Sequence, residues 1–255
     1  MVLSLAGCGR PSEMLESLAV TTTAIPTVTV TFPEGMTVPE YAGLLEENGV
    51  CSAESFISAC RTFWPQYEFL NDIKNPQERP FLLEGYLFPD TYEFYLNMDA
   101  MQVVPKFLDN FATKLTRERL ARISEMGYTP DQVLALASII QEEAVPETMK
   151  EVSSVLHNRL EDPNAKLQCD VTISYLNDSV APYFDSIDAY SENYNCYKRV
   201  GLPAGPITNV GIEAIDAALY PADTDYYFFL TDENGDFHFA VTWEEHERNV
   251  AKYIK

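Results

Sequence analysis

Positive charge is scarce in this chain. Its 255 residues contain 17 Lys and Arg against 39 Asp and Glu, which gives a formal net charge of −22. Nucleic-acid binding depends on contacts between basic side chains and phosphates, so the charge excludes that class of protein, and it disfavours a basic patch for anionic lipids. An apolar run long enough to cross a bilayer is also missing, so we predict no membrane-spanning helix. The content of 46% hydrophobic residues nevertheless supports a folded core.

The motifs of several enzyme classes are missing as well. The sequence has no GxSxG, HExxH or P-loop motif and no GxGxxG after a predicted strand, so nothing points to an acyl-transfer triad, a zinc protease or a nucleotide site. No CxxC pair occurs and no histidine is near a close cysteine pair, so we predict no metal and no cofactor. The residues concerned are Cys8, Cys51, Cys60, Cys169, Cys196, His157, His238 and His246. We expect free thiols, and the spacing leaves a Cys51–Cys60 bridge open.

Residues 1–27 are predicted to be an N-terminal linker. Residues 9–27 are rich in Thr, Ser and Pro, and Leu5-Ala6-Gly7-Cys8 resembles a bacterial lipobox, in which the Cys becomes a lipidated N-terminus. The apolar stretch before Cys8 is too short for a complete signal peptide and has no basic residue. The match is therefore either a coincidence or the end of a lipoprotein export signal whose beginning is missing.

A small module is predicted at residues 28–66. Residues 28–32 alternate β-branched and apolar side chains, which is typical of a strand. A helix follows over residues 37–48, because Thr37 is a suitable N-cap and Glu40 occupies the capping-box position. A second short helix is expected over residues 52–61.

The rest of the chain, residues 67–255, is predicted to form a larger domain of helices and antiparallel strands. The fold class is therefore α+β. Segment 83–94 concentrates four aromatic side chains around a Gly and a Pro, and this density fits either core packing or a ligand platform. Helices are expected at 101–126 (one or two), 129–145, 147–160, 211–219 and from Thr242, with a hairpin of strands at 226–230 and 237–241. Residues 161–210 are expected to be mainly loops.

The helix that begins at Thr129 is the most informative element. Its apolar stripe consists of Val133, Leu136, Ala137, Ile140 and Ala144. Glu143 falls roughly 70° from the centre of this stripe and Glu142 nearly opposite it, so only Glu143 should lie at the margin of the packed face. Partial burial raises the pKa of a carboxyl group, and a protonated carboxyl can act as a general acid. A simpler interpretation is an edge Glu that pairs with an Arg or a backbone amide.

Several segments, in a consistent order over residues 28–250, resemble one family. They are LEGYLFPDTYEF at 83–94, LASIIQEEA at 136–144, VSSVLHNRL at 152–160, LQCDVTISY at 167–175, YNCY at 194–197 and GLPAGPITNVGIEAIDAALYPADTDYYFFL at 201–230. These motifs are similar to those of the MltG (YceG-like) family of endolytic murein transglycosylases. The resemblance also implies that the 28–66 module is LysM-like.

The resemblance implies a carbon–oxygen lyase that cleaves the β-1,4 bond between N-acetylmuramic acid and N-acetylglucosamine in peptidoglycan and leaves a 1,6-anhydro end. One carboxyl group suffices, in contrast to the two carboxyl groups of a glycoside hydrolase. The family's catalytic Glu corresponds to Glu143, which the helical wheel favours independently. The resemblance places further residues in a saccharide-binding cleft, namely Glu84, Asn158, Arg159, Gln168, Asp170, Tyr194, Asn195, Tyr197, Asn209 and His238.

This chain departs from the family pattern at several positions near the expected site. Gln141 and Glu142 replace an acidic residue and a Lys, Pro146–Lys150 replaces a segment with a Glu-Arg pair, and Cys169 and Cys196 each replace a Thr. These changes affect saccharide binding and rate rather than the class of reaction, because Glu143 is retained.

The expected partners are peptidoglycan glycan strands and, through the family, penicillin-binding synthases; no nucleic acid is expected. The expected location is the bacterial cell envelope outside the cytoplasm, with a membrane anchor supplied by a lipid on Cys8 or by a missing N-terminal helix. Two alternatives remain. One is a muramidase-type hydrolase in which Asp170 or another carboxylate activates water. The other is a glycan-binding or scaffolding protein of cell-wall synthesis that has lost catalysis.

Overall fold

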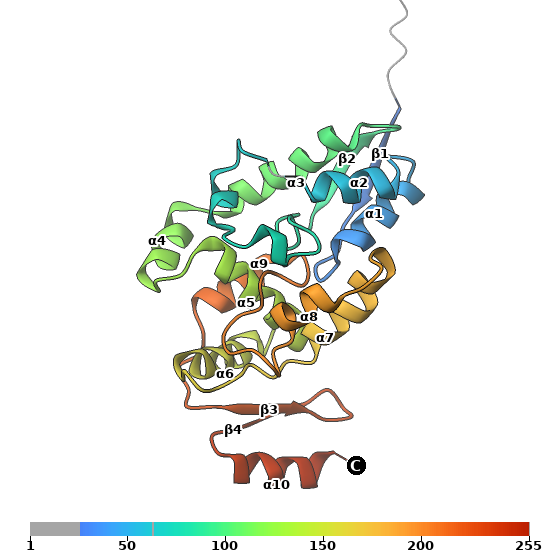
Figure 1. Cartoon of the computed structure of the whole chain (residues 1–255). Helices are drawn as coiled ribbons and strands as arrows, with labels where there is room; N and C mark the ends of the chain where they lie inside the picture. The colour runs from blue at the N-terminus through green and yellow to red at the C-terminus, as the bar shows by residue number, and fades with distance from the viewer. Residues whose placement is uncertain (1–25, 63, 255) are drawn as a thin grey trace, which may run out of the picture.

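A computed structural model describes residues 26–62 and 64–254, and Figure 1 shows its arrangement of helices around two small antiparallel sheets. The fold is mixed α+β, as predicted from the sequence. The N-terminal half contains β1 (Thr27–Thr31), α1 (Val38–Glu47), α2 (Ala53–Cys60), η1 (Glu68–Asp72), η2 (Pro76–Glu78), β2 (Thr91–Tyr95), α3 (Ala100–Lys114) and α4 (Arg117–Glu125). The C-terminal half contains α5 (Pro130–Glu143), α6 (Met149–Glu161), α7 (Val171–Ser174), η3 (Tyr175–Val180), η4 (Ala181–Tyr183), α8 (Asp188–Tyr194), α9 (Ile212–Leu219), β3 (Phe228–Thr231), β4 (Phe237–Ala240) and α10 (Trp243–Tyr253).

The first sheet joins segments that are distant in the sequence. β1 pairs with β2 in an antiparallel register that runs from Thr27 opposite Tyr95 to Thr31 opposite Thr91. Helix α1 begins with the predicted capping box of Thr37 and Glu40, and α2 packs between α1 and α3. The partner strand β2 lies beyond residue 66, where the predicted N-terminal module ends. The sheet of that module is therefore completed by a later segment of the chain. The LysM-like character of the module stays a prediction.

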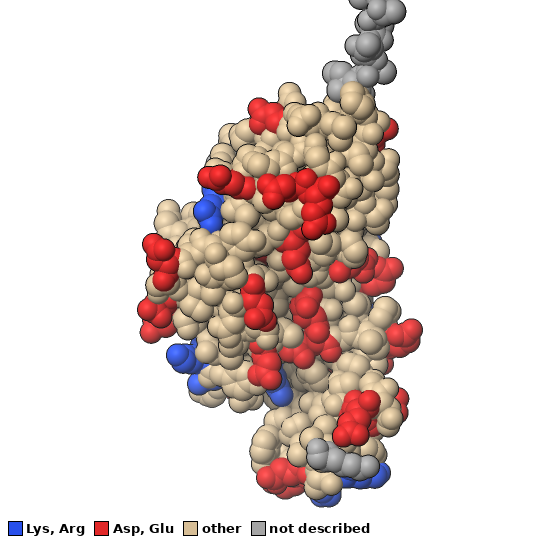
Figure 2. Space-filling view, turned by 90° about the vertical axis from the view of Figure 1, so that its right-hand side faces the viewer, with Lys and Arg blue, Asp and Glu red and all other residues tan. Residues whose placement is uncertain are grey.

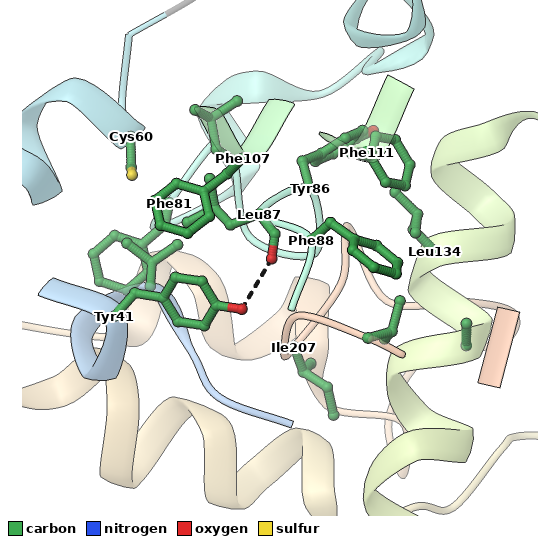
Figure 3. Close-up of a cluster of buried hydrophobic side chains, with 14 of the residues drawn as sticks. Tyr41, Cys60, Phe81, Tyr86, Leu87, Phe88, Phe107, Phe111, Leu134 and Ile207 are labelled. Carbon is green, nitrogen blue, oxygen red and sulfur yellow. Dashed lines mark hydrogen bonds between the residues drawn. The ribbon is translucent and has the colours of Figure 1, made fainter. Parts of the chain in front are cut away.

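The aromatic segment at 83–94 belongs to the core. Tyr86 and Phe94 are almost fully buried, and Figure 3 shows Tyr86 beside Phe111 and Phe107 close to Tyr41. The Tyr41 hydroxyl donates a hydrogen bond to the Leu87 carbonyl at 3.1 Å, which satisfies a polar group inside an apolar cluster. Of the two interpretations left open by the sequence, core packing is the one the structure supports.

Helix α5 is the central helix of the C-terminal half, where it packs against α6 and α9. It begins as predicted, because the Thr129 and Gln132 side chains form a reciprocal capping box. Asp131 in its first turn forms a buried ion pair with Arg79 and accepts a hydrogen bond from the Tyr86 hydroxyl at 2.7 Å. These contacts tie the start of α5 to the N-terminal half of the chain.

Residues 171–194 differ from the sequence expectation, since they form short helical segments rather than loops. Neither α7 nor α8 has a side-chain N-cap, and both are only one or two turns long. The sequence therefore carries only weak signals for α7 and α8, which explains why this region is predicted as loops. Burial of Tyr175, Leu176 and Tyr194 stabilises these turns by tertiary packing instead.

The chain ends in the predicted hairpin and helix. β3 pairs with β4 from Phe228 opposite Ala240 to Thr231 opposite Phe237, and α10 begins with a capping box of Thr242 and Glu245. Helix α10 packs on the hairpin, and none of its described residues is fully buried. Figure 1 shows the hairpin and α10 at the opposite end of the molecule from β1 and β2.

A buried polar junction joins the two halves of the molecule. The Glu84 carboxylate accepts hydrogen bonds from the Val38 backbone N–H at 3.0 Å, the Asn209 side-chain amide at 3.2 Å and the Tyr175 hydroxyl at 3.3 Å. Asn209 is fully buried, and its carboxamide oxygen accepts from the N–H groups of Gly85 and Leu87, both at 3.0 Å. Burial raises the pKa of Glu84 well above its usual value.

Gly85 allows this junction to close. Its φ of +85° is unfavourable for residues with a side chain, and a Cβ atom there would lie 2.4 Å from the Cβ of Pro206. The motif similarity implied a saccharide cleft for Glu84 and Asn209. The structure places both in the interior, where they hold together the start of α1, the 83–88 turn and the loop before α9.

Removal of the Asn209 carboxamide should destabilise the whole fold. Asn209→Ala deletes four hydrogen bonds, including one to the Met36 carbonyl, and leaves buried partners unpaired. We expect a loss of about 3–5 kcal/mol in the free energy of unfolding, which corresponds to a fall in Tm of about 10 °C.

Circular dichroism during thermal unfolding measures this effect. Asn234→Ala in the exposed β3–β4 turn serves as the matched control and should change the free energy of unfolding by less than about 0.5 kcal/mol. Equal melting of the Asn209 variant and the wild type would show that the junction does not carry the proposed stability.

Candidate active site

Glu143 is the last residue of α5, where the helix emerges from the core. Its side chain is half-buried and that of Glu142 is exposed, as the helical wheel predicts. The helix stops here because Ala144 adopts an extended backbone conformation and Pro146 follows. Because the helix ends at this point, Glu143 lies at the edge of the face of α5 that packs against the core.

Glu143 faces a cavity of about 440 Å³, which we call the Glu143 cavity. Its lining comes from α5, α6, the segment that leads into α7, Tyr197, β3 and α10. The lining residues are Glu143, Arg159, Gln168, Cys169, Asp170, Val171, Tyr197, Phe228, Phe229, Leu230, Thr231, Trp243 and His246. Five predicted site residues thus meet here, namely Glu143, Arg159, Gln168, Asp170 and Tyr197.

Gln168, Asp170 and Tyr197 are held together by hydrogen bonds. The Tyr197 hydroxyl donates to the Asp170 carboxylate at 2.6 Å, and the Gln168 N–H donates to the Cys196 carbonyl at 3.1 Å. Gln168 has a φ of +54°, a left-handed conformation that only one other non-glycine residue shares among the described residues. Such conformations cost free energy and persist where surrounding contacts impose them, often at functional sites.

Arg159 and Asn158 fix the backbone that leads into β3, which contributes part of the cavity lining. Arg159 Nε donates to the Tyr227 carbonyl at 2.7 Å, and its Nη1 donates to the Leu167 carbonyl. The Asn158 amide donates to the carbonyls of Thr224 at 2.8 Å and Tyr226 at 2.9 Å. Asn158 does not line the Glu143 cavity. Its contacts fix the backbone that leads into β3, and with it the position of the hairpin.

The surroundings of Glu143 favour its neutral form. Burial is the largest cause, the negative charge of Asp170 adds to it, and together they raise the pKa of Glu143 to about 7. A hydrogen bond with Cys169 and the positive charge of Arg159 act in the opposite direction. A carboxyl group with this pKa can both donate and accept a proton near neutral pH. The geometry therefore suits general acid and base chemistry.

The remaining predicted residues lie outside the Glu143 cavity. Tyr194 is fully buried against Tyr175, with ring centroids 5.5 Å apart. His238 accepts or donates a hydrogen bond with Asp232 at 2.9 Å and stacks on Tyr253. Asn195 supports the wall, because its side-chain oxygen accepts from the Tyr197 N–H at 2.9 Å. Glu84 and Asn209 form the junction described above.

Phe228, Trp243 and His246 line the Glu143 cavity, although no sequence motif points to them as site residues. The hairpin and the final helix are both predictable, but nothing local in the sequence shows that they face Glu143. Within residues 26–62 and 64–254, no cluster of three or more His, Cys, Asp or Glu side chains is arranged to hold a metal ion.

Acidic side chains are spread over the surface of the molecule that is visible in Figure 2. Figure 2 shows many Asp and Glu and few Lys and Arg on the visible face. Acidic side chains on the surface (Figure 2) therefore contribute to the net charge of −22, in addition to those that line the Glu143 cavity. An anionic ligand would be repelled at long range, so binding depends on short-range contacts.

Comparisons with known proteins agree on one family. A model of the YceG-like family matches residues 6–252. An endolytic murein transglycosylase of Bacillus subtilis (strain 168) is 33% identical over 207 residues, which cover 79% of this chain and 56% of the relative. An endolytic murein transglycosylase of Streptococcus pneumoniae (strain D39) is 29% identical over 248 residues, covering 89% and 44% respectively. The chain thus spans about half the length of the curated relatives it matches.

A solved structure supports the same grouping. The crystal structure of a YceG-like protein from Listeria monocytogenes superposes with a TM-score of 0.70 at 26% identity, and the match covers 88% of this chain and 76% of that one.

Neutralisation of Asp170 should lower the pKa of Glu143. Asp170→Asn removes the negative charge that is the second largest cause of the raised value, so the carboxyl of Glu143 should titrate below about 7. NMR titration of ¹³C-labelled glutamate side chains measures this, with Glu143→Gln to assign the signal. Asp178→Asn, an exposed carboxylate outside the Glu143 cavity, is the matched control. An unchanged midpoint in the Asp170 variant would mean that burial alone sets the pKa.

Proposed function

Because this chain belongs to the YceG-like family, we propose that it cleaves glycan strands of peptidoglycan as an endolytic lytic transglycosylase. The bond cleaved is the β-1,4 bond between N-acetylmuramic acid and N-acetylglucosamine. The observation that carries this proposal is the half-buried Glu143 carboxyl, whose pKa is raised to about 7 inside an open cavity. A neutral carboxyl is the proton donor that a glycosidic oxygen needs as a leaving group.

The proposed reaction uses Glu143 twice. The neutral carboxyl first donates its proton to the glycosidic oxygen, and the bond from that oxygen to C1 of the muramic acid breaks. The resulting carboxylate then takes the proton of the C6 hydroxyl as the C6 oxygen attacks C1. The product carries a 1,6-anhydro ring, no water is consumed, and Glu143 is protonated again.

The polar residues of the Glu143 cavity are proposed to bind the sugar. Gln168, Asp170 and Tyr197 offer amide, carboxylate and phenol groups to the hydroxyl and N-acetyl groups of a sugar in the cavity that Glu143 also lines. Arg159 contributes a positive charge close to the developing carboxylate. Asn158 and Asn195 are proposed to act indirectly, since they fix the walls.

A muramidase-type hydrolase is the second candidate function, because Asp170 lies in the same cavity as Glu143 and influences it electrostatically. A carboxylate there is placed to activate a water molecule in an inverting hydrolysis. The hydrogen bond from the Tyr197 hydroxyl occupies one oxygen of Asp170, which leaves the other oxygen for a water molecule. The two reactions differ by one water in the product.

The proposed substrate places the protein in the bacterial cell envelope, outside the cytoplasm, with penicillin-binding synthases as candidate partners. No described helix is long and apolar enough to cross a membrane. The lipobox-like Leu5–Cys8 lies outside the described residues, so a lipid anchor stays a proposal.

The product mass tests the reaction class. Purified sacculi digested with the wild-type chain should release muropeptides with 1,6-anhydro ends, and Glu143→Gln should lower the rate by at least about a hundredfold, since general acid catalysis contributes on that order. Mass spectrometry of the soluble fraction distinguishes anhydro products from hydrolysis products, which are heavier by one water. Hydrolysis products would favour the muramidase, and binding to sacculi without turnover would favour the scaffolding protein.

The pH dependence tests the role of Glu143 as the acid. The active form is protonated, so kcat/KM should fall as pH rises through about 7 and decline about tenfold for each further pH unit. Release of soluble muropeptides from labelled sacculi between pH 5 and about 9 measures this profile. Asp170→Asn should move the alkaline limb to lower pH, as its charge raises the pKa of Glu143. Undiminished activity at high pH would contradict a neutral Glu143 as the proton donor.

A further inference from the structure

Three aromatic rings form one side of the Glu143 cavity. Phe228 comes from β3, and Trp243 and His246 come from the first turn of α10. The ring centroids of Phe228 and Trp243 are 5.6 Å apart, those of Phe228 and His246 5.3 Å, and those of Trp243 and His246 5.4 Å. The three rings therefore support one another, and we call them the aromatic wall.

Trp243 is held in place but remains open to solvent. Its exposed fraction is 55%, the highest among the exposed large hydrophobic residues of the described chain. Exposure of an indole forgoes hydrophobic stabilisation that the chain could obtain by burial. The two neighbouring rings contact Trp243 within the wall, so its outer surface is free while its orientation is restricted.

The aromatic wall presents little charge to a ligand. Burial and the nearby positive charge of Arg159 lower the pKa of His246, which favours the neutral ring. His246 Nδ1 is buried and has no hydrogen-bond partner among the described residues, so ring packing rather than a hydrogen bond holds the imidazole. The Arg159 guanidinium lies over the Phe228 ring, with Cζ 5.4 Å from the centroid.

The lining of the Glu143 cavity complements a pyranose ring. Gln168, Asp170 and Tyr197 supply hydrogen-bonding groups, and the aromatic wall supplies apolar ring surface to the same cavity. A sugar has equatorial hydroxyl groups at its rim and an apolar C–H face, which packs on aromatic rings. The volume of about 440 Å³ falls in the usual range for a small-ligand site.

From this arrangement we infer that Trp243, supported by Phe228 and His246, is a stacking platform for one sugar ring of the glycan strand beside Glu143. The inference rests on the proposed function for the identity of the sugar. It adds a binding contact that the motif similarity does not point to. Trp243 acts on the affinity for glycan and on the placement of the scissile bond, whereas Glu143 moves the proton.

Intrinsic fluorescence can test the platform without turnover. The chain has two tryptophans, of which Trp64 is 6% exposed and Trp243 is 55% exposed. In the Glu143→Gln variant, titration with peptide-free peptidoglycan glycan strands should shift the emission to shorter wavelength with saturation, because a sugar ring displaces water from Trp243. The same titration with Trp243→Phe added should give no shift, since buried Trp64 is unaffected.

Affinity and rate measurements complete the test. Trp243→Ala should raise the Kd for glycan strands roughly tenfold, because it removes the indole and with it the apolar contact to the sugar ring, and should raise KM more than it lowers kcat. Trp243→Phe keeps a flat ring and should stay within about threefold of wild type. Tyr95→Ala removes an aromatic of similar exposure on β2, far from the cavity lining, and should leave Kd and KM unchanged.

The outcomes separate the platform from the reaction. A saturable emission shift in Glu143→Gln, together with no release of product by the wild-type chain, would support the platform and contradict the proposed catalysis. Release of anhydro products with an unchanged KM for a folded Trp243→Ala, and no emission shift, would overturn the platform and leave the catalysis standing. Thermal unfolding of each variant shows whether it is folded.

Discussion

The buried hydrogen bonds of Glu84 and Asn209 are the constraint on which the rest of the molecule depends. The loop that carries Asn209 continues directly along α5, where the Ile207 N–H donates to the Ser138 hydroxyl at 3.0 Å and the Gly211 N–H donates to the Gln141 side chain at 3.1 Å. Glu143 is only two residues beyond Gln141. The position of the proposed catalytic carboxyl is therefore coupled, through α5 and one loop, to the interior contact between the two halves of the chain.

The same molecule uses burial of a carboxyl group in two ways. Glu84 is sealed in the interior, where backbone and side-chain donors surround it and no substrate can reach it. Glu143 is buried only in part, so its pKa is raised but its oxygens still face a cavity. The structural carboxyl of Glu84 and the proposed catalytic carboxyl of Glu143 thus differ in access rather than in the direction of the pKa shift.

The sequence predicts most helices, the strand β1, both strands of the β3–β4 hairpin and the location of Glu143, because caps and apolar periodicity are local signals. It does not predict β2, the partner of β1. It does not predict which motif residues reach the cavity. Glu84 and Asn209 are polar residues in distinctive motifs, and the chemistry of a buried hydrogen-bond network resembles that of a sugar site. Trp243 and His246 escape prediction for the opposite reason, since only the tertiary packing of the C-terminal hairpin brings α10 to Glu143.

The attachment of the hairpin has a consequence for how such a site can diversify. Asn158 and Arg159 hold the segment before β3 through its backbone carbonyls, which every amino acid provides, and α10 contributes no fully buried side chain. Substitutions along β3 and α10 can thus change the surface offered to a glycan with little disturbance of the fold. Glu143 on α5 stays fixed while this wall is free to vary, so the proposed chemistry and the proposed substrate contacts are encoded in separate parts of the chain.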